Sequence, residues 1–145
     1  MKKIALVLFV NVLMISSAMA RDSIRDYSVN EALSLEQSKS ALGQEVAFYF
    51  GDMAHGKVVK KFGEFKTNKK TNAFNKTDTA ACQWTFLSAM LSLRDRALRE
   101  GGNAVINIKS IYKGHLTSSN STFQCGAGAF VSGVALVGAV VKIEK

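Results

Sequence analysis

The chain has 145 residues, which is enough for one domain and too short for two ordinary ones. It is 48% apolar, 21% charged and free of proline, which excludes disordered, collagen-like and low-complexity proteins. Its formal net charge of +8 makes it a basic chain, and basic chains attract anionic partners.

The first twenty residues are typical of a secretory signal peptide. Two lysines precede an apolar run over residues 4–15, and small residues follow that end in an Ala-x-Ala pattern at Ala20. The run is short for a membrane span, which needs about 20 apolar residues. We expect cleavage after Ala20 and export of a single domain, residues 21–145, to the periplasm or beyond. The exported part would carry no lipid anchor, because Arg21 is not a cysteine.

Cys82 and Cys125 are the only cysteines. An oxidising compartment favours a disulfide between them. The chain has no CxxC motif, and the isolated His55 and His115 lack the spacing of zinc ligands. We therefore predict a structural disulfide and no metal ion. A metal-binding or thiol-dependent site that uses both cysteines and a histidine is the alternative.

The region before residue 50 predicts a short helix and a strand. Residues 21–30 are mostly polar and are predicted to form a lead segment without helix or strand. Ser34 and Gln37 fit a capping box for a helix over residues 35–42 that ends at a glycine. Residues 45–50 are rich in aromatic and apolar side chains, which predicts a buried strand.

A lysine-rich hairpin is expected next. Residues 57–65 predict its first strand, residues 68–70 its tip and residues 71–74 a short return. Phe62, Phe65 and Phe74 lie between the lysines, where they could stack on bases, but we expect them in the core.

The clearest element is a long helix, which Asp78 or Thr79 could cap and which the glycine pair after Glu100 would end. Apolar residues recur at spacings of three and four: Cys82, Phe86, Ala89, Met90, Leu93 and Ala97. Further apolar residues widen this stripe and predict contacts on two sides: Trp84, Leu87, Leu91 and Leu98.

Strands are predicted to follow the helix. From residue 103 the pattern alternates, with Ala104, Ile106 and Ile108 on one face and Asn107 and Lys109 on the other. A polar loop over residues 113–121 and an extended segment from residue 122 come next.

The C-terminal segment, residues 126–143, is apolar on both alternate faces, which predicts a strand pair buried on two sides. Either the helix over residues 35–42 or a second copy of the chain would cover the second face, and we favour self-association. The expected fold is α+β: one long helix on a small, mostly antiparallel sheet, with a short N-terminal helix.

Charge is concentrated in one segment, residues 57–76, where seven lysines accompany one acid. These lysines are candidate anion-binding residues: Lys57, Lys60, Lys61, Lys66, Lys69, Lys70 and Lys76. The alternative, which we favour, is a solvated charged hairpin that keeps a sheet edge from pairing with other chains. Export argues against a nucleic-acid partner.

Several stretches resemble a family of small exported proteobacterial proteins often labelled "excinuclease ATPase subunit". They are residues 48–51, 67–74, 81–84, 94–97, 101–108 and 125–129. More distantly, the long helix followed by a Gly-x-Asn-Ala-Val strand resembles the YbjQ-like fold, which the envelope stress sensor lipoprotein RcsF and a family of uncharacterised lipoproteins share. The resemblance implies a helix on a small sheet, and the YbjQ-like relatives imply that oligomers are possible.

The family label does not predict an activity here. An excinuclease ATPase needs a GxxxxGK[ST] phosphate loop, which the chain lacks. The chain also lacks a lipoprotein cysteine, and no combination of residues predicts a catalytic site or a cofactor. We expect a non-enzymatic binding or interaction protein of the bacterial envelope. Its expected partner is an envelope protein or an anionic envelope component.

Overall fold

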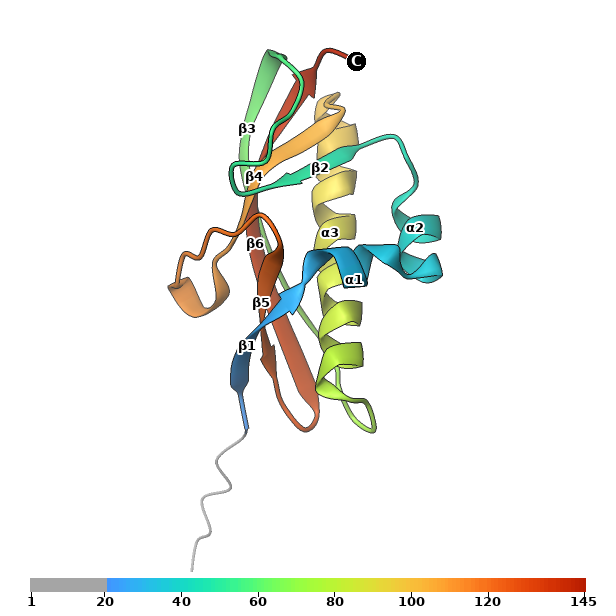
Figure 1. The fold of residues 1–145 in the computed structure, drawn as a ribbon, viewed down its shortest axis with the longest axis vertical. Coiled ribbons are helices and arrows are strands. Elements are labelled where there is room, and N and C mark those ends of the chain that lie inside the picture. Colours follow the sequence, from blue (N-terminus) through green and yellow to red (C-terminus); the bar gives the residue numbers. More distant parts are fainter. Residues whose placement is uncertain (1–20) are drawn as a thin grey trace, which may run out of the picture.

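The computed structural model describes residues 21–145, so the predicted signal peptide lies outside the described residues. Figure 1 shows the order of the elements. They are β1 (Ser23–Ser28), α1 (Val29–Ser34), α2 (Glu36–Leu42), β2 (Ala47–Phe50), β3 (Val58–Asn72), α3 (Asp78–Glu100), β4 (Ala104–Ser110), the 3-10 turn η1 (Tyr112–Gly114), β5 (Thr122–Ala127) and β6 (Val131–Ile143). Within these residues no helix is both long enough and apolar enough to cross a membrane.

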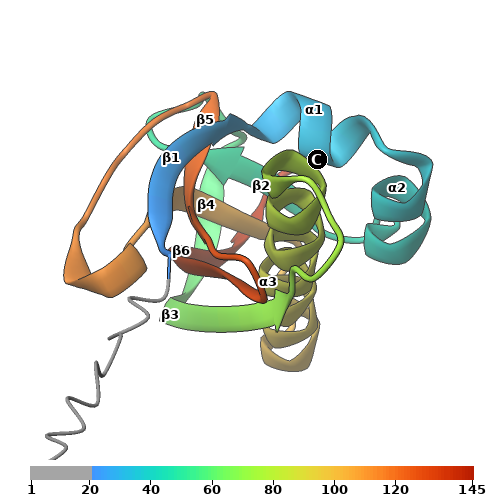
Figure 2. The same ribbon diagram turned by 90° about the horizontal axis from the view of Figure 1, so that it is seen from below.

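The sheet is organised around β6, and it curls strongly (Figure 2). Strand β3 pairs antiparallel with β6 along nearly its whole length, from Val58 opposite Ile143 to Asn72 opposite Val131. On its other side β6 pairs antiparallel with β5 and then with β4. Strand β1 extends the sheet beyond β5, and β2 extends it beyond β4 as the one parallel neighbour. The predicted α+β class is confirmed.

The core lies between α3 and the sheet. Phe86 and Met90 of α3 are almost fully buried, and the Phe86 ring stacks on Phe123 of β5 with centroids 4.0 Å apart. The second side of α3 contacts α1 and α2. The predicted contact on a second side is present at Leu87, which is buried. It is wrong for Trp84 and Leu98, which are 45% and 41% exposed.

The ends of α3 are close to the prediction. Its N-cap is Thr77, one residue before the predicted candidates, and the Thr77 hydroxyl accepts a hydrogen bond from the Ala80 amide at 3.1 Å. Gly101 ends the helix in the left-handed conformation, with φ of 85°.

The prediction for the N-terminal segment is wrong in two respects. The predicted polar lead forms β1 and the start of α1, because β5 offers β1 an antiparallel partner and Ser28 caps α1 through the Glu31 amide. The predicted capping box is also absent. Ser34 ends α1, where its hydroxyl donates to the Asn30 carbonyl, and α2 begins after Leu35 without a side-chain cap.

The predicted hairpin over residues 57–74 is one continuous strand, β3, of 15 residues. Its partner explains the difference: β6 has 13 residues and offers a ladder along its full length, which a hairpin tip at residues 68–70 would break. Phe74 was expected in the core, which is wrong, because it lies in the loop after β3 and is 54% exposed.

The alternation predicted for β4 is only partly present. Ala104 and Ile108 are buried and Asn107 is exposed, as predicted. The register shifts between Ile106 and Lys109, where Asn107 has φ of 53°, and Val105 is fully buried whereas Ile106 is only half-buried.

The second face of β6 is covered within the single chain, and not by α2, which packs on α3. Val137 is only 7% exposed because it lies opposite Lys66 on one side and Lys109 on the other, whose long aliphatic stems flank it. Tyr112 packs against Gly133 of the same face. The face therefore gives no argument for self-association.

Candidate anion-binding groove

A groove of about 270 Å³ runs between β3 and the C-terminal half of α3. Its lining contains basic and hydroxyl side chains but no acid: Phe65, Lys66, Thr67, Asn68, Lys69, Ser92, Leu93, Arg96 and Arg99. The groove therefore joins part of the predicted lysine set to two arginines from another element.

Strand and helix periodicity place these residues together. Alternation along β3 turns Phe65, Thr67 and Lys69 toward α3, whereas Lys66 points to the opposite face beside Val137. Arg96 and Arg99 are three residues apart and so share one side of α3. Three cationic side chains, those of Lys69, Arg96 and Arg99, thus converge on the groove.

Arg96 is held in place by two contacts. Its guanidinium lies over the Phe65 ring, 4.0 Å from the centroid, and its Nε donates to Glu100 Oε1 at 2.9 Å. Its terminal Nη atoms make no hydrogen bond to any residue in the range 21–145. An oriented guanidinium with two unpaired nitrogens matches the geometry of a carboxylate or phosphate.

Two further observations point to a ligand. Within the described part of the chain, Lys69 and Arg99 form no salt bridge. Thr67 is only 7% exposed, and its buried Oγ1 has no hydrogen-bond partner. A buried hydroxyl without a partner costs about 1–3 kcal/mol, so an oxygen atom from water or ligand is expected beside it.

The structure does not bring the seven predicted lysines together. A strand of this length extends over roughly 50 Å, and Lys60, opposite Lys142, lies at the end of β3 farthest from Lys70. Lys57 precedes the strand and Lys61 lies near Lys60. Lys76 lies beyond the strand, where its Nζ donates to the Asn72 carbonyl.

Sequence reasoning missed Arg96 and Arg99. Their spacing marks the polar side of a helix, which most often faces solvent. Arg96 and Arg99 become part of a site only because β3 packs along this polar side of α3.

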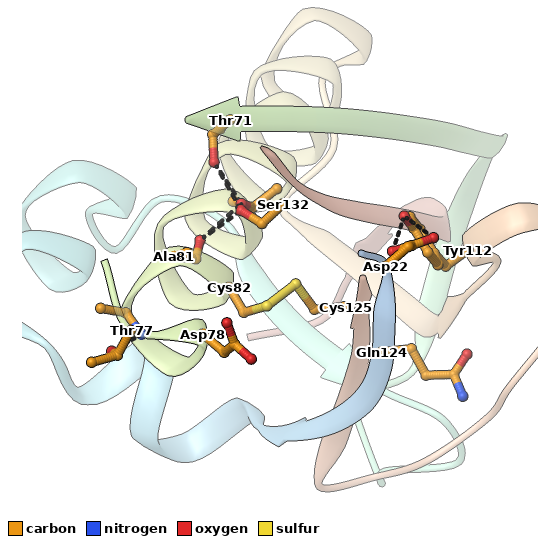
Figure 3. The surroundings of a disulfide bond; sticks show 12 residues. Asp22, Thr71, Thr77, Asp78, Ala81, Cys82, Tyr112, Gln124, Cys125 and Ser132 are labelled. Carbon is orange, nitrogen blue, oxygen red and sulfur yellow. Dashed lines mark hydrogen bonds between the residues drawn. A yellow bond between two sulfur atoms is a disulfide. The ribbon is translucent and has the colours of Figure 1, made fainter. Parts of the chain in front are cut away.

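The predicted disulfide is present between Cys82 of α3 and Cys125 of β5 (Figure 3). Both cysteines are fully buried, and no free cysteine remains in residues 21–145. The two histidines are exposed, and His55 Nδ1 lies 2.8 Å from the Gly56 carbonyl oxygen. In the described range no three His, Cys, Asp or Glu side chains gather where they could hold a metal ion.

Buried hydroxyls near the disulfide are satisfied by one another (Figure 3). Thr85 of α3 lies 2.6 Å from the Thr71 hydroxyl of β3 and also within hydrogen-bond distance of Ser132 of β6. The Ala81 carbonyl accepts from Thr85 and from Ser132. This network joins α3 to both strands and has no free group to offer a ligand, so its role is structural.

Asp22, Tyr112 and Lys113 form a second polar cluster, which fastens the start of the described chain. The Tyr112 hydroxyl donates to Asp22 Oδ1 at 3.1 Å, and Lys113 forms a salt bridge with Asp22. Burial raises the pKa of Tyr112, and the Asp22 carboxylate raises it further. The hydrogen bond to Asp22 also raises the pKa of Lys113. Both groups therefore keep their protons at neutral pH. This favours a structural role for the cluster over a role in proton transfer.

No family model, curated protein or solved structure matches the chain. The resemblance to the exported proteobacterial family therefore stays a prediction.

Proposed function

We propose that the protein is an exported, non-enzymatic binding protein of the bacterial envelope that holds an anionic component in the groove between β3 and α3. The observation that carries the proposal is the oriented guanidinium of Arg96, with Lys69 and Arg99 beside it and no acid in the lining. Glu100 lies outside the lining, where it forms a salt bridge with Arg96 Nε and leaves the two Nη atoms for the ligand.

Two features support the export part of the proposal. The first twenty residues have the pattern of a signal peptide. The Cys82–Cys125 disulfide is of the kind that persists in oxidising compartments.

The size of the groove limits the ligand. Sites for drug-sized molecules usually have about 300–1,000 Å³, so a groove of about 270 Å³ suits a single phosphate or carboxylate group of a larger molecule. The guanidinium geometry favours an oxyanion over a halide ion. We therefore expect a phosphorylated or carboxylated envelope component to bind through one headgroup.

Titration calorimetry with inorganic pyrophosphate tests the proposal. Loss of one charge-assisted contact in Arg96→Gln or Arg99→Gln is expected to weaken binding about ten- to a hundredfold. Lys60→Gln is the matched control, because it removes the same charge from the far end of β3. It should change the affinity less than about threefold, since salt screens charges beyond about 8–10 Å. Equal losses in all three variants would instead indicate diffuse attraction to a basic surface.

The lysines of β3 have a second proposed role. Among residues 21–145, strand β3 pairs only with β6, so its other side is a sheet edge without a partner strand in this range. Charged side chains on such an edge oppose pairing with other chains. Lys61→Thr with Lys70→Thr, two lysines outside the groove lining, should therefore increase aggregation without weakening pyrophosphate binding, as light scattering and calorimetry would show.

A further inference from the structure

Two phenylalanine rings are exposed together at one end of the molecule. Phe74 lies in the connection from β3 to α3 and Phe130 in the turn from β5 to β6 (Figure 1). The rings stack with centroids 5.5 Å apart and planes 3° apart, yet Phe74 is 54% and Phe130 66% exposed. The Ala73 amide donates to the Phe130 carbonyl at 2.8 Å and joins the two loops. We call Phe74, Phe130 and the half-exposed Val131 the aromatic tip.

The surroundings of the aromatic tip add an indole ring and positive charge. Trp84, in the second turn of α3, is 45% exposed, and Lys76 Nζ lies 5.9 Å from its ring centroid. The nearby Asp78 is neutralised by a two-point salt bridge with Arg21, so it does not offset Lys76. Exposed aromatic rings combined with lysines are typical of surfaces that lie at the interface of a lipid bilayer.

The tip is also the end at which the described structure begins. The carbonyl oxygen of Arg21 lies 2.8 Å from the position that a Cβ on Gly128, in the β5–β6 turn, would take. In the sequence, Arg21 follows the apolar run of residues 4–15. The residues before Arg21 therefore join the domain at the aromatic tip.

We propose that the aromatic tip docks on an anionic bilayer surface. Phe74 and Phe130 enter the headgroup region, where their burial removes apolar surface from water, and Lys76 lies against anionic headgroups. This docking surface is separate from the groove between β3 and α3, and it does not depend on the proposed ligand.

Vesicle binding tests the proposal directly. The protein is purified from the periplasm, and its mass establishes whether residues 1–20 are present. We expect it to float with vesicles of phosphatidylethanolamine and phosphatidylglycerol. It should float less with vesicles of phosphatidylcholine alone. Phe74→Ser with Phe130→Ser should weaken binding on the order of tenfold for each ring. Leu116→Ser is the matched control, because Leu116 is 64% exposed on the loop before β5, and it should bind as the wild type does.

Trp84 provides a second readout, because it is the only tryptophan of the chain. Vesicles that contain bromine-labelled lipids should quench its fluorescence if this end of the molecule faces the bilayer. Binding without quenching would place the contact on another surface, such as the lysines of β3, and would overturn the proposal. Vesicle binding by the double variant that is as strong as that of the wild type would also overturn the proposal. So would a wild-type dimer that the double variant does not form, because a second copy of the chain would then cover the aromatic tip. Arg96→Gln changes the groove but not the aromatic tip, so it should bind vesicles as the wild type does. Failure of the vesicle proposal can therefore be distinguished from failure of the groove proposal.

Discussion

The guanidinium of Arg96 lies over the ring of Phe65, 4.0 Å from its centroid, although the two residues belong to different elements and are 31 positions apart in the sequence. Glu100 fixes the Nε side of the same group. The orientation of the charge, and not only its presence, is therefore set by the fold.

Replacing Phe65 tests this orientation, because Phe65→Leu keeps every charge of the groove. Loss of the ring should weaken pyrophosphate binding about two- to tenfold, which is the range expected for a cation–π contact. Phe65→Tyr restores the ring face and should restore the affinity. If Phe65→Leu lowers the melting temperature but binds pyrophosphate normally, Phe65 only packs against the core.

The disulfide joins the first turns of α3 to β5 across the core. Because it closes a loop of 43 residues, Cys82→Ser or Cys125→Ser should lower the free energy of unfolding by about 2–5 kcal/mol. Chemical denaturation of the variants and of the wild type measures this difference. Wild-type protein that melts at the same temperature when oxidised and when reduced would contradict the prediction.

The sequence predicted elements whose signals are local. Helix α3 was predicted because its apolar spacing, its N-terminal aspartate and threonine and the glycine that follows it all lie within or next to the element. The disulfide was predicted because only two cysteines exist. The continuous strand β3 was missed, because turn-forming residues at 68–70 are overruled by a partner strand more than 60 residues away.

Only the lysines of the groove could be predicted from the sequence, because the other cationic residues are brought to it by tertiary packing. The lysine-rich segment was recognised as an anion-binding candidate, but its lysines lie on both faces and both ends of β3, and two of them lie outside the strand. Selecting Lys69 and adding Arg96 and Arg99 requires knowing which face of β3 lies along which side of α3. Neither the strand periodicity of β3 nor the helix periodicity of α3 contains this information, because it depends on how the two elements pack in the tertiary structure.

The contact between Tyr112 and Gly133 gives a steric prediction. A Cβ at position 133 would lie 2.7 Å from Tyr112 Cε2, and the ring has little room to move because its hydroxyl is bonded to Asp22. Gly133→Ala should therefore lower the free energy of unfolding by about 1–3 kcal/mol. In a Tyr112→Ala background the same substitution should cost much less. Equal costs in both backgrounds, measured by a double-mutant cycle, would contradict the steric explanation.

The salt bridge between Arg21 and Asp78 predicts a pH dependence of stability. Arg21 donates two hydrogen bonds of 2.9 Å to the Asp78 carboxylate, and mainly for this reason the pKa of Asp78 is lowered, although partial burial opposes the shift. A carboxyl group whose pKa is lower in the folded than in the unfolded chain stabilises the fold above its unfolded pKa, which is about 4 for aspartate. That stabilisation is lost as the pH falls through the folded pKa.

Asp78→Asn should therefore melt at a lower temperature than the wild type at neutral pH, and the difference should shrink as the pH falls below about 4. High salt should also reduce it at neutral pH, because Arg21 is half exposed. Asp52→Asn is the control, since Asp52 is exposed and forms no salt bridge within residues 21–145. Thermal melts of the three proteins across this pH range measure the effect. A difference between Asp78→Asn and the wild type that persists unchanged in acid would show that the carboxylate charge of Asp78 is not its source.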